Sequence, residues 1–189
     1  MRDMQQVDWD SLPVPIDDKK AEHLKNLFIE KDIILESTSK KNINLKKLEG
    51  LTVIFFYPRT GHPEKPVPPG WNLIAGARGC TPQSCSYRDY YEELKSSGVD
   101  NIFGVSTQDS DYQLEAKDRL HLPFDLLSDN KLELVNYLNL PIFEFNKEIL
   151  NKRLTLIIKD KQIIKYFYPV FPPDKDVLNV IKWIEQVNS

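Results

Sequence analysis

Short apolar runs alternate with amphipathic segments along most of the chain. Residues 51–57 form a continuous run rich in β-branched and aromatic side chains, which is typical of a strand buried on both faces of a sheet. Other short apolar runs are bounded by turn-forming residues, and two pairs of them are close enough to form hairpins. The predicted strands are 33–35, 43–45, 51–57, 102–106, 124–127, 153–158 and 162–167.

Between these strands, apolar residues recur at helical spacing. Asp17 or Asp18 could cap the first helix and Asp109 or Ser110 the third, and Gly98 is a suitable residue to end the second. The predicted helices are 17–27, 80–97, 109–120, 130–138 and 174–187. Strands alternate with helices at first, and a hairpin and a helix close the chain. This order predicts the α/β class, with a central mixed sheet flanked by helices on both faces.

A chain of 189 residues fits one domain with a short extension. We expect an N-terminal arm with the start of the first helix at 1–23 and a domain at 24–187, with Trp9, Leu12 and Val14 packing the arm onto it. Residues 59–76 interrupt this domain as a long, proline-rich insertion. Loops of that length are uncommon and often functional, so it could be a lid or an interface. We expect the insertion to bury three apolar side chains, Trp71, Leu73 and Ile74.

The composition of the chain argues against several classes of function. A net charge of −3 without a lysine cluster argues against nucleic-acid binding, and no apolar run is long enough to span a membrane. The N-terminus lacks the apolar core of a secretory signal. Two cysteines are too few for a disulfide framework, so we expect a reducing cytoplasm. His23, His62 and His121 are scattered without ligand spacing, so we expect no metal and no cofactor.

Both cysteines lie in the stretch 76–89, which indicates redox chemistry. Cys80 is predicted at a helix N-terminus, where free N–H groups and the helix dipole favour a thiolate. On an ideal helix the Cα atoms of Cys80 and Cys85 would be roughly 8.6 Å apart, beyond the ~7 Å reach of a disulfide. Pro82 is tolerated only in the first turn of a helix, which it weakens. The pair therefore suits a cycle in which the helix is intact when reduced and locally unwound when oxidised.

Such a pair can reduce a peroxide. A thiolate attacks a peroxide oxygen and becomes a sulfenic acid, which a neighbouring thiol converts into a disulfide. An external dithiol then restores both cysteines by exchange.

The run Gly-Cys-Thr-Pro-Gln-Ser-Cys-Ser-Tyr-Arg-Asp at 79–89 resembles the signature of Q-type peroxiredoxins, also called bacterioferritin comigratory proteins. Phe-Phe-Tyr-Pro at 55–58 is similar to the strand and active-site proline of that family. Residues 153–158 resemble the later strand that carries its arginine. The chain also looks like a subgroup with a proline-rich insertion before the cysteine. The resemblance implies a thioredoxin-like fold over about residues 24–187.

The resemblance also implies roles for individual residues. Cys80 would be the peroxidatic cysteine and Cys85 the resolving one. Arg153 would lie beside the thiolate and the peroxide, and Pro58 would shield the site from water. Arg88 would support the site, either through an ion pair or by holding a residue that contacts the reacting groups.

One position departs from the family pattern. Family members usually have a threonine three residues before the first cysteine, and its hydroxyl contacts the peroxide. This chain has Ala77 there. Thr60, two residues after Pro58, could supply the hydroxyl, and Thr81 is a second candidate.

The implied activity is a thiol-dependent peroxidase for hydrogen peroxide or small organic hydroperoxides, recycled by thioredoxin, glutaredoxin or another thiol. It would act as a monomer or a homodimer. A thiol–disulfide oxidoreductase or redox sensor is an alternative, although Cys-x-x-Cys is the usual spacing for exchange. A copper-binding metallochaperone would need a partner histidine. A catalytically silent interaction module could use the insertion as its binding surface. Independently of the function, we expect Arg59 and Arg78 to hold the insertion by ion pairs and His62 to face solvent.

Overall fold

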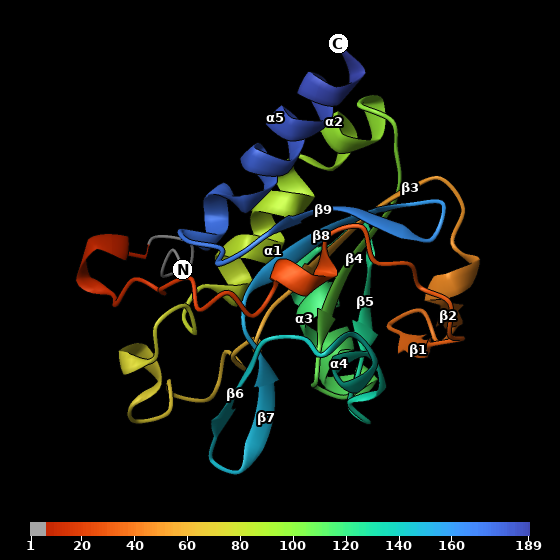
Figure 1. Cartoon of the computed structure of the whole chain (residues 1–189). Helices are drawn as coiled ribbons and strands as arrows, with labels where there is room; N and C mark the ends of the chain where they lie inside the picture. Colours follow the sequence, from red (N-terminus) through yellow and green to blue (C-terminus); the bar gives the residue numbers. More distant parts are fainter. Residues whose placement is uncertain (1–6) are drawn as a thin grey trace.

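A seven-stranded mixed sheet forms the centre of the computed structural model, which describes residues 7–189 (Figure 1). Its strand order is β2-β1-β5-β4-β3-β8-β9, in which β3, β4 and β5 run parallel and the other pairs antiparallel. The predicted mixed sheet and both hairpins within it are confirmed. The strands are β1 Ile34–Ser37, β2 Asn42–Asn44, β3 Leu51–Phe56, β4 Val99–Ser106, β5 Asp125–Ser128, β8 Leu154–Lys159 and β9 Gln162–Phe167.

The central strand β3 is buried on both faces, as its continuous apolar run predicts. Its side chains alternate, so that Val53, Phe55 and Tyr57 point to one hydrophobic cluster while Ile54 and Phe56 point to another. Each cluster forms the core on one face of the sheet. This alternation makes the sheet the middle layer of three.

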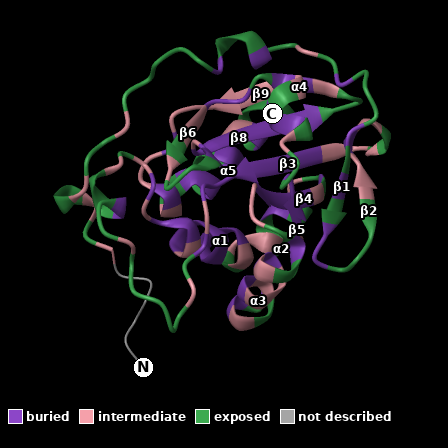
Figure 2. Cartoon of the chain, turned by 90° about the horizontal axis from the view of Figure 1, so that it is seen from below, coloured by how far each residue is buried: buried purple, intermediate pink, exposed green. Residues whose placement is uncertain are grey.

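Helices cover the two faces unequally (Figure 2). Apolar residues of α1, α2, α3 and α5 pack on the face of Phe55, and α4 packs on the opposite face together with the N-terminal residues 21–33. The helices are α1 Cys80–Asp89, α2 Tyr91–Ser96, α3 Ser110–Leu120, α4 Glu133–Leu138 and α5 Asp176–Asn188. None of the helices within residues 7–189 combines the length and the apolar character needed to cross a bilayer.

Two predicted helices differ from the structure. The helix expected over 80–97 is divided at Tyr90, whose φ of −100° and ψ of 15° separate α1 from α2. The helix expected over 17–27 is only a 3₁₀ turn at Glu22–Leu24. There the Asp17 carboxylate accepts a hydrogen bond from the Lys19 N–H (2.9 Å), and Lys19 has a positive φ of 64°. Such local side-chain bonds compete with helical geometry.

The short hairpin of β6 (Ile142–Phe145) and β7 (Glu148–Asn151) is not predicted by the sequence analysis. Its turn residues Asn146 and Lys147 have φ values of 50° and 67°, the left-handed geometry of a tight hairpin turn. Phe145 packs edge-on against Trp71 of the insertion at 5.1 Å between ring centroids. Trp71 is therefore buried, as expected, whereas Leu73 is 82% exposed, contrary to expectation.

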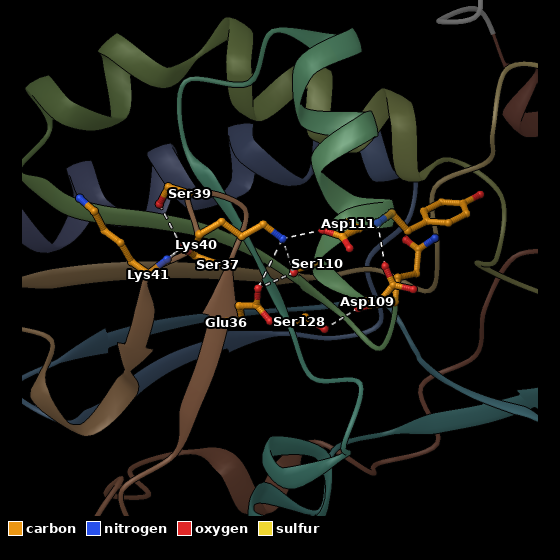
Figure 3. A network of polar contacts seen from close by, with 11 residues as sticks. Glu36, Ser37, Ser39, Lys40, Lys41, Asp109, Ser110, Asp111 and Ser128 are labelled. Carbon is orange, nitrogen blue, oxygen red and sulfur yellow. Dashed lines mark hydrogen bonds and ion pairs between the residues drawn. The ribbon is translucent and has the colours of Figure 1, made fainter.

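A polar network fastens the β1–β2 turn to the start of α3 (Figure 3). The Lys40 ammonium contacts Asp111 Oδ1 at 2.5 Å and Ser110 Oγ at 3.2 Å, and Ser110 donates to Glu36 at 2.8 Å. Asp109 caps the helix by accepting from the Tyr112 N–H (2.7 Å), one of the two predicted caps. Because these groups are largely exposed, the network positions the turn more than it stabilises the fold.

Candidate active site

The first turn of α1 begins at Cys80 because of the residue before it. Gly79 has a φ of 113°, which favours glycine, and a Cβ there would lie 2.7 Å from the Trp9 ring and 2.8 Å from Pro173. Trp9 of the arm thus packs on the helix start, as expected, whereas Val14 is 64% exposed. Cys80 is only 4% exposed and is the first residue of α1, where backbone N–H groups have no partner within the helix.

Arg153 is the residue just before β8, and its side chain contacts Cys80. Its Nη2 lies 3.3 Å from the Cys80 Sγ and 3.1 Å from the Ala77 carbonyl oxygen, and its Nε donates to the Gly76 carbonyl at 3.1 Å. The register of β3 with β8 brings Arg153 to the end of the strand that precedes Pro58. Only 3% of Arg153 is exposed, and the backbone carbonyls of Gly76 and Ala77 hold its guanidinium in place.

A buried chain of hydrogen bonds continues from Arg153 to α5. The Gln83 amide oxygen accepts from Arg153 Nη1 at 2.6 Å, and its Nε2 donates to Asp176 Oδ2 at 3.0 Å. The same carboxylate oxygen accepts from the Tyr87 hydroxyl (2.9 Å) and the Thr155 hydroxyl (2.7 Å). Burial raises the pKa of the Asp176 carboxyl, and these donors together with the Arg153 charge oppose the rise.

A cavity of about 190 Å³ opens above Cys80. Cys80 and Thr81 line it from α1, and Val67, Pro68 and Trp71 line it from the proline-rich insertion. The insertion therefore forms one wall of the approach to the cysteine. Among the described residues there is no group of three or more histidine, cysteine, aspartate or glutamate side chains arranged to hold a metal ion.

Of the remaining residues singled out from the sequence, Thr81 lines this cavity, whereas Pro58, Cys85 and Thr60 do not. Pro58 is buried two residues after the end of β3, and Cys85 is 3% exposed within α1. Thr60 is fully buried, and its hydroxyl donates to Gln108 Oε1 at 3.3 Å. Among the described residues, no hydrogen bond joins Thr60 to Cys80, whereas Thr81 shares the cavity with Cys80.

Tyr57 belongs to the same hydrophobic cluster as Cys80 and is fully buried. Burial first, and a negative charge on Cys80 to a smaller extent, raise the pKa of its phenol. The Tyr57 side chain therefore stays neutral, and its ring packs beside that of Phe55. Phe55 in turn stacks on Tyr87, with 4.2 Å between the two ring centroids.

Ion pairs and ring contacts hold the insertion on the domain. Arg59 pairs with Glu148 of β7 at 3.0 Å, and its guanidinium lies over the Trp71 ring, 5.4 Å from the centroid. Arg78 donates instead to a neutral partner, Asn72, at 3.3 Å, so the expected ion pair at this position is replaced by a hydrogen bond.

Two further expectations have different outcomes. His62 is half-buried instead of facing solvent, with its ring 6.5 Å from that of Tyr112. Arg88 makes the expected ion pair, with Asp89 at 2.8 Å, and also donates to the Leu120 carbonyl at 2.8 Å, which ties α1 to the end of α3.

The fold and the site together define a class of protein. A mixed sheet with a buried cysteine at a helix N-terminus, in contact with an arginine that precedes a later strand, is typical of thioredoxin-like proteins. The Redoxin family matches residues 20–181, and the chain belongs to that family. Its relatives are Q-type peroxiredoxins, which confirms the resemblance of the cysteine motif.

Two relatives illustrate the sequence similarity. Peroxiredoxin Q, chloroplastic, of Suaeda salsa is 28% identical over 155 residues, covering 81% of this chain and 64% of that protein. Peroxiredoxin bcp1 of Schizosaccharomyces pombe is 34% identical over 110 residues, covering 57% of this chain and 48% of the relative. The chain thus spans less than two thirds of the length of each of these two relatives.

Solved structures share the fold. Peroxidoxin BcpB of Mycobacterium tuberculosis superposes with a TM-score of 0.70 at 20% identity, covering 87% of this chain and 98% of that one. A peroxiredoxin Q variant of Xylella fastidiosa gives a TM-score of 0.71 at 15% identity, covering 87% and 97%. The thioredoxin-like peroxiredoxin fold expected from the sequence is therefore confirmed.

Proposed function

We propose that the protein is a thiol-dependent peroxidase with Cys80 as the peroxidatic residue. The observation that carries the proposal is the 3.3 Å contact between Arg153 Nη2 and the Cys80 Sγ at the base of a cavity. The Cys80 thiolate attacks one peroxide oxygen, the O–O bond breaks, and the other oxygen leaves as an alkoxide or hydroxide that takes up a proton. Cys80 is thereby oxidised to a sulfenic acid.

Arg153 supports this step in two ways. Its charge stabilises the thiolate before attack, and its donors can stabilise the negative charge that develops on the leaving oxygen. Pro58 excludes water from the strand end beside the site. The hydroxyl of Thr60 or Thr81 binds the peroxide. Thr81 is favoured because it lines the cavity, whereas the Thr60 hydroxyl would first have to break its hydrogen bond to Gln108.

Resolution follows within the same helix. The Cys85 thiol attacks the Cys80 sulfenic acid, so that an S–S bond forms and water leaves. Both cysteines lie in α1, where residues five apart are too distant to bond, so the first turn must unwind. A thioredoxin, a glutaredoxin or another thiol then reduces the disulfide. The low cysteine content supports a reducing compartment such as the cytoplasm.

Cys85→Ser is expected to stop the cycle after one oxidation. Reduced wild-type protein mixed with one equivalent of hydrogen peroxide should form the Cys80–Cys85 disulfide, as intact mass spectrometry would show. The variant should gain a single oxygen at Cys80 and lose turnover with thioredoxin. Wild-type protein whose Cys80 stays reduced after stopped-flow mixing with peroxide would contradict the proposed function.

A redox sensor on the same fold is the second candidate. The cavity favours the peroxidase, because thiol exchange with a protein partner needs an exposed sulfur, whereas the Cys80 Sγ lies below a small cavity and the residue is 4% exposed. Steady consumption of peroxide over many turnovers with a thiol reductant separates the two, since a sensor reacts once.

We infer that the insertion shapes the approach of the peroxide. Val67, which is 47% exposed, lines the cavity with two methyl groups, so it offers an apolar contact to the tail of an organic hydroperoxide. Val67→Ser should lower the rate constant for cumene hydroperoxide about threefold to tenfold, because it removes ~1 kcal/mol of apolar contact. The rate with hydrogen peroxide should change less than twofold.

The matched control is Val14→Ser on the arm, an exposed valine outside the cavity. Stopped-flow rates for both peroxides should be unchanged in that variant. An equal loss of rate with both peroxides in Val67→Ser would show that the insertion does not distinguish peroxides by their organic tail.

A further inference from the structure

We propose that Asp176 is a positioning residue for two steps of the reaction. Through Gln83 it orients Arg153 against Cys80, and through Gln83 and Tyr87 it holds α1 in the helical form that disulfide formation must open. The proposal rests on the proposed peroxidase function and adds a residue from α5 to it.

The first part of the proposal follows from the orientation of the Gln83 side-chain amide. Asp176 Oδ2 accepts from Gln83 Nε2 at 3.0 Å, and a carboxylate can only accept at that position. The amide oxygen must therefore face the other way, toward Arg153 Nη1 at 2.6 Å. Without the carboxylate the amide could rotate and present its NH₂ group to the guanidinium. Asp176 thus sets the direction in which Arg153 is held.

The second part follows from the face of α1 on which these residues lie. Cys80, Gln83 and Tyr87 are three and four residues apart, so they form one row along the helix. Gln83 lies between the two cysteines that must meet, and Tyr87 lies one turn further on. Unwinding the first turn of α1 breaks the Gln83 contacts to both Arg153 and Asp176. The carboxylate therefore favours the closed helix.

The burial of Asp176 is consistent with this role. It is 1% exposed at the first position of α5, and its Oδ1 is buried without a hydrogen-bond partner among residues 7–189. A buried carboxylate with an unpaired oxygen is costly. All three of its donors, Gln83, Tyr87 and Thr155, contact the other oxygen.

These contacts predict opposite effects on the two steps. Weakening them should slow the attack of Cys80 on peroxide, because Arg153 is less well oriented. It should speed disulfide formation, because the helix opens more easily. A general loss of stability would not slow the first step while speeding the second.

Asp176→Asn is the test variant, since asparagine has the same shape and accepts more weakly without its charge. Asp129→Asn is the matched control. Asp129 is also a 1% exposed carboxylate, but it accepts from the Leu134 and Val135 N–H groups at 3.0 and 2.9 Å on the opposite face of the sheet. Rapid-quench mixing with hydrogen peroxide, followed by mass spectrometry, gives both rate constants for each protein.

Asp176→Asn should lower the sulfenic acid rate constant roughly tenfold and raise the disulfide rate constant about threefold to tenfold, since charged hydrogen bonds are the stronger ones. It should also form less sulfinic acid in excess peroxide, because its sulfenic acid persists for a shorter time. The control should keep both rate constants within twofold of the wild type. Equal behaviour of the two variants overturns the proposal.

Two measurements keep the test decisive. Should Asp176→Asn fail to fold, Tyr87→Phe removes one donor and keeps the ring that stacks on Phe55, and it should speed the disulfide step by a smaller factor. A disulfide step unchanged or slowed in Tyr87→Phe contradicts the second part. Failure of the wild-type protein to form a sulfenic acid contradicts the proposed function itself. Wild-type activity with unchanged rates in Asp176→Asn contradicts only the role of Asp176.

Discussion

Replacing Cys80 with serine is expected to abolish peroxide consumption, with a loss of at least roughly a thousandfold. A serine hydroxyl has no anionic form near neutral pH, so the attacking group is lost. The cavity, Arg153 and the helix start stay in place, because serine has nearly the shape of cysteine and Cys80 makes its two polar contacts through the sulfur, with Arg153 and Ala77. Consumption of hydrogen peroxide in the presence of a thiol reductant measures the loss.

Cys85→Ser is the matched control, because the two cysteines are equally buried in the same helix. That variant should still react once with peroxide at the wild-type rate, whereas Cys80→Ser should not react at all. If Cys80→Ser reacted once and Cys85→Ser did not, the order of the two cysteines would be reversed. Full activity in Cys80→Ser would contradict the role proposed for Cys80.

The fold could be predicted from the sequence where burial alone decides it. Residues 51–57 are predicted as a central strand because no charged side chain interrupts the run of β-branched and aromatic residues, and 51–56 form β3. Prediction failed where short-range geometry decides instead. The β6–β7 hairpin depends on the left-handed residues Asn146 and Lys147, and an asparagine between two apolar runs was the available signal.

The site shows the same division. Cys80 and Cys85 follow from a local motif, and Arg153 follows from resemblance to a known strand. The link from Gln83 to Asp176 could not be predicted, because it joins residues 93 positions apart through a contact that only the packing of α5 on α1 creates. Gln83 lies within the motif and could have been singled out, whereas Asp176 in a polar stretch gives no signal.

Arg153→Lys is expected to lower the rate constant with hydrogen peroxide roughly 10²- to 10³-fold, the usual effect of losing a preorganised donor at a reacting centre. The arginine uses all three nitrogens at once, on Gly76, Gln83 and Cys80. A lysine ammonium is a point charge and cannot reproduce this fork, although it keeps the positive charge. The expected loss of rate therefore reports the lost geometry of the guanidinium contacts, because the positive charge is kept.

Arg88→Lys is the control for this prediction. Arg88 also joins α1 to a distant backbone carbonyl, that of Leu120, but it lies away from the cysteine. Both variants should lose a little stability in thermal unfolding, and only Arg153→Lys should lose reactivity. Because Arg153 also holds Gln83, its replacement should free the first turn of α1 and speed the disulfide step, as in Asp176→Asn. A slow first step with an unchanged second step would mean that Arg153 stabilises the reacting oxygens without restraining the helix.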